Sequence, residues 1–154
     1  MEAPTQIQPT KLADYLETLT KPVFESGLNW KVIEGKWPGF REAFQHFDPV
    51  TVASFTPDDL DRLTADERIV RSRKKVEATV HNAQVMIALE KEHGSFKSYL
   101  QSQGSFETLV KDMRKRFKFV GDFGAYYFLY VVGEPVPDHH EYREKLLEGG
   151  KKPG

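Results

Sequence analysis

Helical periodicity along the whole chain is the feature that most restricts its fold. Apolar residues recur three or four positions apart, as at Val76, Val80, Ala83 and Ile87 within a helix expected from about Ser72 to His93. No run alternates with period two for long, and the Asn-Gly and Asp-Gly hairpin signals are absent. The pattern predicts an all-α fold, a single compact helical domain of about eight short helices.

Capping residues mark where several of these helices begin and end. Asp48 and Thr56 each precede a proline, and Ser105 precedes another apolar-periodic run, so all three are expected helix N-caps. Gly94 predicts the stop of the long helix. Pro22 falls within the first expected helix and must kink it or begin a new one, because proline has no N–H to donate.

The chain has no cysteine among its 154 residues, which excludes a disulfide scaffold, thiolate metal sites and a cysteine nucleophile. No stretch approaches the roughly eighteen apolar residues of a membrane span. The first ten residues are too polar for a signal peptide. We therefore expect a soluble intracellular protein with a flexible tail over residues 1–10, one domain over 11–148 and a second tail over 149–154.

Basic residues gather in two clusters although the net charge is −1. Such clusters are typical either of solvated helix ends or of contact with a polyanion, since phosphate contacts supply much of the affinity for nucleic acid. The first cluster contains Arg68, Arg71, Arg73, Lys74 and Lys75, and the second contains Lys111, Arg114, Lys115, Arg116 and Lys118. If they bind DNA, the contacts are expected from Arg71, Arg73, Lys75, Arg116 and Lys118.

A turn with the sequence Phe-Lys-Phe-Val-Gly separates two expected helices, and the segment around residues 106–132 resembles a helix-hairpin-helix motif. Gly121 permits close backbone approach or a left-handed conformation, and the N–H groups that open the next helix are unpaired. Such a turn can hold a DNA phosphate on its amides, here at Phe119, Val120 and Gly121. Most of the seven aromatic residues between 117 and 130 are expected to pack in the core.

Four segments in order resemble the bacterial 3-methyladenine DNA glycosylase I (Tag) family of the helix-hairpin-helix DNA glycosylases. They are Ser26–Trp30, Phe40–Pro49, Ile69–Val76 and the turn at Phe117–Gly121. The resemblance covers roughly residues 24–139. It implies an all-α enzyme that flips a damaged base into a pocket and hydrolyses its glycosidic bond.

The resemblance also implies which side chains form the pocket. Trp30 is the expected aromatic wall for the base, with ordinary core packing as the alternative. Pro22 stands where the family has a base-reading glutamate, so Glu25, one turn later, is the candidate substitute, unless it is only a surface carboxylate. Asp138 follows the hairpin by 17 residues, near the spacing of a catalytic aspartate in the wider superfamily, but it also suits a helix N-cap.

The family's zinc ligands are not matched as a set. His139 matches one ligand, but Arg143 stands where the family has a cysteine, so no metal and no cofactor are expected.

Two functions follow from these residues. The first is a repair glycosylase that acts on damaged purines in double-stranded DNA. It is expected to be a monomer with no membrane partner, located in a bacterial-type cytoplasm and associated with the nucleoid. The second is a non-catalytic helix-hairpin-helix protein that binds DNA or senses lesions.

Overall fold

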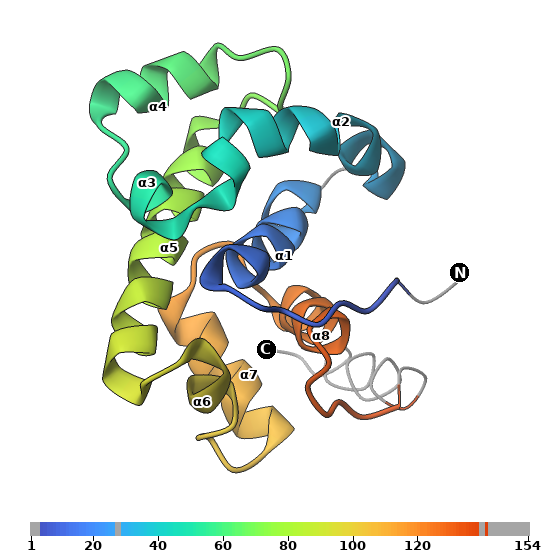
Figure 1. Ribbon diagram of the computed structural model, residues 1–154. Helices are drawn as coiled ribbons and strands as arrows, with labels where there is room; N and C mark the ends of the chain where they lie inside the picture. The colour runs from blue at the N-terminus through green and yellow to red at the C-terminus, as the bar shows by residue number, and fades with distance from the viewer. Residues whose placement is uncertain (1–3, 27–28, 139–140, 142–154) are drawn as a thin grey trace, which may run out of the picture.

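The computed structural model describes residues 4–26, 29–138 and 141, and within these ranges the protein contains helices and no strand (Figure 1). The all-α prediction is therefore confirmed. The end of the domain expected over 11–148 and the tail expected over 149–154 lie outside the described residues. The elements are α1 Leu12–Glu25, α2 Trp30–Ala43, the 3-10 helix η1 Gln45–Phe47, α3 Pro49–Ala53, α4 Pro57–Thr64, α5 Arg73–His93, α6 Phe96–Leu100, α7 Phe106–Arg116 and α8 Asp122–Val131.

The predicted caps are the residues that begin and end these helices. The carboxylate of Asp48 accepts a hydrogen bond from the N–H of Thr51 at 3.1 Å, and the Thr56 hydroxyl accepts one from the N–H of Asp59 at 3.2 Å. Ser105 caps α7 in the same way, and Gly94 ends α5 in the left-handed conformation with φ 86°. Each cap satisfies backbone groups that a helix terminus leaves unpaired.

Helix α1 continues through Pro22 to Glu25, so no new helix begins at the proline. Pro22 is buried, and it packs against Gly124 of α8, where an added Cβ would lie only 3.3 Å from the Cβ of Pro22. The proline therefore belongs to the contact between α1 and α8.

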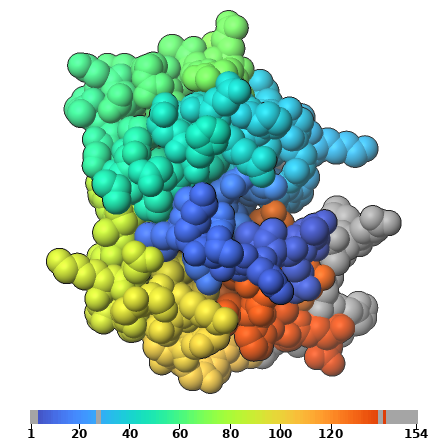
Figure 2. Space-filling view, viewed as in Figure 1, coloured from blue at the N-terminus to red at the C-terminus, as the bar shows by residue number. Residues whose placement is uncertain are grey.

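Helix α1 lies at the centre of the molecule (Figure 1), where it packs against α2, α3, α5 and α8. The space-filling view shows the N-terminal segment and α1 between a half formed by α2–α4 and a half formed by α6–α8 (Figure 2). Long helix α5 connects the two halves, and buried aromatic rings including Phe24, Phe40, Phe44 and Phe47 fill the core beside it. None of the helices in the described ranges has the length and apolar character needed to cross a bilayer.

Candidate functional site

The turn between α7 and α8 has one strained residue, and it is not the glycine. Phe119 adopts the left-handed conformation with φ 59°, whereas Gly121 has φ −99° and is the N-cap of α8. A Cβ added at Gly121 would meet no atom within 4 Å, so packing within the protein does not require glycine there. The glycine leaves open space beside the start of α8, and as N-cap it contributes no side-chain hydrogen bond.

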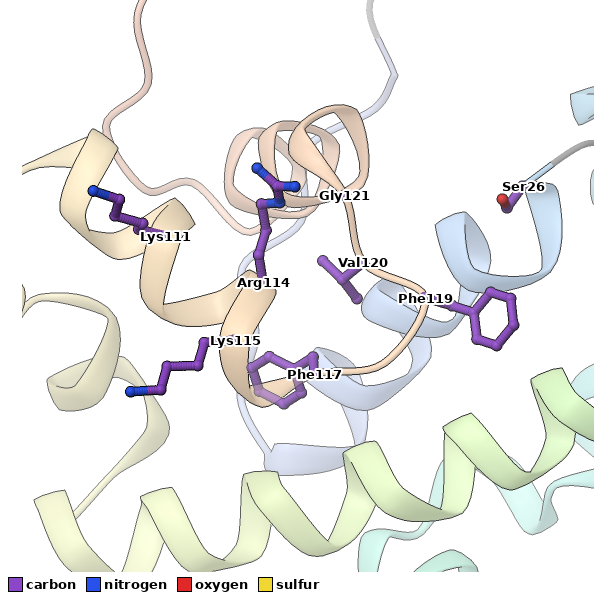
Figure 3. A pocket seen from close by; sticks show the side chains of 8 residues that line it. All are labelled: Ser26, Lys111, Arg114, Lys115, Phe117, Phe119, Val120 and Gly121. Carbon is purple, nitrogen blue, oxygen red and sulfur yellow. The ribbon is translucent and has the colours of Figure 1, made fainter. Parts of the chain in front are cut away.

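An open hollow of about 520 Å³ lies beside this turn (Figure 3). Ser26, at the end of α1, forms part of its wall, so the hollow joins two segments that are far apart in sequence. The ring of Phe119 is 46% exposed, and the side chains of Lys111 and Lys115 extend from α7 (Figure 3). Arg114 pairs with Asp122 at 3.1 Å. The hollow therefore combines cationic side chains with open backbone, which suits an anionic ligand. Its lining residues are Ser26, Lys111, Arg114, Lys115, Phe117, Phe119, Val120 and Gly121.

Two neighbouring side chains of α5 hold the backbone of the turn, and the sequence analysis did not single them out for this role. The amide of Asn82 makes two hydrogen bonds to the backbone of Lys118. The Nε2 atom of His81 lies 3.0 Å from the carbonyl oxygen of Arg116. The only sequence signal was a polar residue, Asn82, beside the apolar stripe of a long helix.

Three of the cations predicted to contact DNA are engaged within the protein. The ammonium of Lys75 donates to the carbonyl oxygens of Phe24 at 3.1 Å and Ser26 at 2.7 Å, and burial lowers the pKa of this lysine. The other two form ion pairs, Arg73 with Asp61 at 2.7 Å and Arg116 with Asp112 at 2.7 Å.

Arg71 and Lys118 differ from these three cations. Both are exposed, and within the described part of the chain neither side chain makes a hydrogen bond or ion pair.

The expected base wall, Trp30, is the first residue of α2 and is half-buried. Its ring lies against Tyr127 of α8, with centroids 4.9 Å apart and planes inclined by 40°. Burial raises the pKa of the Tyr127 phenol well above its usual range, and the carboxylates of Glu34 and Glu17 add to the shift. The phenol therefore stays protonated at neutral pH. Tyr127, one of the aromatic residues between 117 and 130, therefore lies against the candidate base wall.

The two candidate carboxylates lie in different surroundings. Glu25 is half-buried at the end of α1, and burial raises its pKa while the nearby Lys75 opposes the shift. Asp138 is exposed and accepts a hydrogen bond from the N–H of Glu141 at 3.2 Å, as an N-cap does. The hydroxyl of Tyr126 donates to the carbonyl oxygen of Pro137 at 2.8 Å and so ties this segment to α8.

At Pro22, where the resemblance placed the base-reading glutamate, the chain has a buried apolar contact and no carboxylate. In the described ranges no three His, Asp or Glu side chains are grouped so that they could hold a metal ion, and His139 lies outside those ranges.

Comparisons with known proteins agree with this arrangement. The family model described as methyladenine glycosylase matches residues 9–115. DNA-3-methyladenine glycosylase 1 of Escherichia coli (strain K12) is 30% identical over 152 residues, covering 80% of this chain and 81% of the relative. DNA-3-methyladenine glycosylase of Haemophilus influenzae is 30% identical over 136 residues, covering 75% of this chain and 73% of the relative.

A similar solved structure is that of 3-methyladenine DNA glycosylase I from Staphylococcus aureus, described in terms of 3-methyladenine recognition. It superposes with a TM-score of 0.74 at 31% identity and covers 84% of this chain and 80% of its own. The helical fold, the hairpin and the matches over most of both chains lead to one conclusion: this chain belongs to the methyladenine glycosylase family.

Proposed function

We propose that this protein excises alkylated purines of the 3-methyladenine type from DNA, by flipping the base out of the helix and hydrolysing its N-glycosidic bond. The observation that carries the proposal is family membership, with relatives named DNA-3-methyladenine glycosylase that match about four fifths of this chain. One chain supplies the hairpin, the cations and Trp30, so we infer a monomer that acts on double-stranded DNA in the bacterial cytoplasm, at the nucleoid.

The pocket chemistry required for such a reaction is modest. A purine methylated at a ring nitrogen carries positive charge and is already a good leaving group. An aromatic stack, which Trp30 can provide, is worth about 1–3 kcal/mol per base, and this offsets part of the few kcal/mol needed to unstack one nucleotide. A carboxylate near the sugar stabilises the positive charge that develops there, and Glu25 and Asp138 are the two candidates.

The backbone of the DNA is bound at the hairpin in this proposal. A DNA phosphate would lie at the N-terminus of α8, where the helix favours an anion. The open space at Gly121 would let the phosphate approach the backbone closely. Lys111 and Lys115 line the hollow beside the turn, and Lys118 belongs to the turn itself, so these three lysines would add positive charge near the phosphate. Arg71 would contribute from the loop before α5.

A second candidate function is a lesion-sensing protein that binds damaged DNA without cleaving it. One observation favours it. At the family's glutamate position, Pro22 is packed against Gly124, so no carboxylate can read the base from that place. Trp30 is compatible with both functions, because an aromatic ring can stack on a flipped base whether or not the base is then released.

The deciding experiment is a base-release assay on DNA methylated at purine N3 and N7, with duplex binding measured in parallel. Trp30→Ala should reduce release far more than binding, because the stack acts on the flipped base only. Val32→Ala is the matched control, an exposed apolar residue of the same helix, and should change neither. Glu25→Gln and Asp138→Asn should reduce release only where the carboxylate is catalytic. Intact binding without release by the unmodified protein would support the lesion sensor.

A further inference from the structure

Asn82 is almost fully buried, with 2% of its surface exposed, in the middle of α5. Its Oδ1 accepts a hydrogen bond from the N–H of Lys118 at 2.8 Å, and its Nδ2 donates to the carbonyl oxygen of Lys118 at 3.1 Å. One side-chain amide thus binds both backbone groups of a residue that lies 36 positions away. A neighbouring β-strand would make the same two kinds of hydrogen bond to Lys118, but here a helix side chain makes them to a turn.

The neighbouring His81 extends the same contact. Its Nε2 lies 3.0 Å from the carbonyl oxygen of Arg116, at the end of α7. The two contacts fix the backbone immediately before Phe119.

Phe119 needs such support, because it is a non-glycine residue in the left-handed region, at φ 59°. A bulky side chain in this conformation costs free energy and persists only where the surroundings hold it. Val120, on the other side, is buried, so the turn is anchored before and after the strained residue.

We propose that Asn82 is a positioning residue for DNA binding: it holds the turn at residues 117–121 in the conformation that presents the turn and the side chain of Lys118 to a phosphate. The inference rests on the proposed function in one respect: it takes the turn as the surface that contacts DNA. Asn82 touches no DNA itself, being buried under the turn. A turn that is already ordered loses less conformational entropy when it binds, so the two hydrogen bonds from Asn82 to Lys118 raise the affinity for DNA.

The same helix offers a matched control. Gln84 also uses a side-chain amide to bind a backbone carbonyl, that of Ala53 at 3.0 Å, but this contact ties α5 to α3 rather than to the hairpin. Replacing either residue by alanine removes hydrogen bonding between a side-chain amide of α5 and the backbone of another segment. Of these two residues, Asn82 holds the turn and Gln84 does not.

The test measures binding of a labelled undamaged duplex to the full chain. Asn82→Ala should weaken binding by about tenfold, since it removes two hydrogen bonds and the order of the turn, while Gln84→Ala should stay within about twofold of the unmodified protein. Hydrogen exchange should quicken at the Lys118 amide in Asn82→Ala and stay unchanged at the α5 amides. A second pair, Asn82→Asp and Gln84→Glu, adds the same charge at both sites, and Asn82→Asp should bind DNA more weakly than Gln84→Glu.

The proposal is overturned if Asn82→Ala binds DNA as tightly as the unmodified protein, or if both members of each pair lose affinity equally. It is also overturned if exchange quickens throughout α5, because the weaker binding would then reflect unfolding. Failure of the unmodified protein to release bases, with binding intact, would count against the glycosylase and leave the role of Asn82 standing, because the readout is binding.

Discussion

Tyr99 shows how a single buried side chain fixes one of the cations near the hairpin. The residue is fully buried, and its hydroxyl donates to a carboxylate oxygen of Asp112 at 2.5 Å. The same oxygen accepts a hydrogen bond from Arg116 at 2.7 Å. Burial, together with Asp112, raises the pKa of Tyr99 well above its usual range, so the phenol is protonated at neutral pH and can donate to the carboxylate.

Tyr99→Phe should therefore lower the free energy of unfolding by about 1–2 kcal/mol, the cost of removing a partly buried hydrogen bond to a charged group. Urea unfolding at pH 7 measures the change. Tyr130→Phe is the control, since the structure shows no hydrogen bond from that hydroxyl within the described ranges, and it should change stability by less than about 0.5 kcal/mol. Equal decreases for the two variants would show that the contact with Asp112 contributes nothing.

Single side chains are also where prediction from the sequence reached its limit. The sequence singled out Trp30 and the cations as candidates, but it did not show that Lys75 and Arg116 are held by partners of their own. A charge count records how many cations a segment has, whereas their availability depends on carbonyls and carboxylates that the fold brings near. Asn82 was missed for the same reason, because its partner lies 36 residues away.

Whole helices were easier to predict than their contacts. The caps at Asp48, Thr56 and Ser105 are local, since each side chain bonds a backbone group only three residues on, and the sequence predicted all three. The left-handed conformation at Phe119 could not be predicted, because it depends on support from α5. Likewise, the packing of Pro22 under α8 depends on a glycine about a hundred residues later.

Two glycines of α2 allow a paired test of helix packing. A Cβ added at Gly39 would lie 2.6 Å from the carbonyl oxygen of Arg68 and 2.9 Å from its Cβ, whereas one added at Gly35 would meet nothing within 4 Å. Gly39→Ala should therefore destabilise the protein by about 1–3 kcal/mol, because backbone must shift to relieve the clash. Gly35→Ala should stabilise it by about 0.5–1 kcal/mol through helix propensity alone.

Thermal and urea unfolding of the two variants check these signs. The substitution is chemically identical in both, so intrinsic helix propensity cancels from the comparison. A stabilised Gly39→Ala protein would mean that α2 and the loop at Arg68 are not in contact in solution.

At the scale of the molecule, a net charge of −1 must be reconciled with binding to a polyanion. The acids and bases are unevenly distributed along the chain: helix α4 carries Asp58, Asp59 and Asp61, whereas the hairpin carries the cations Lys111, Lys115 and Lys118. Electrostatic attraction at physiological salt acts over about 8 Å, so DNA at the hairpin responds to the local cations rather than to the net charge.

Charge reversal at exposed cations tests this directly. Lys118→Glu and Arg71→Glu should each weaken binding to all duplexes alike, damaged or not, and should flatten the dependence of log K on log salt concentration by about 0.9 for each phosphate that is no longer neutralised. The backbone of Lys118 keeps its hydrogen bonds to Asn82 in the Lys118→Glu variant, so the turn stays in place.

The control is Lys91→Glu, which changes the net charge equally. Lys91 lies in the last turn of α5, away from the start of that helix near Arg71, and its reversal should leave the slope unchanged. If all three reversals flatten the slope equally, affinity follows the net charge; if none does, the clusters are solvated helix ends that do not contact DNA.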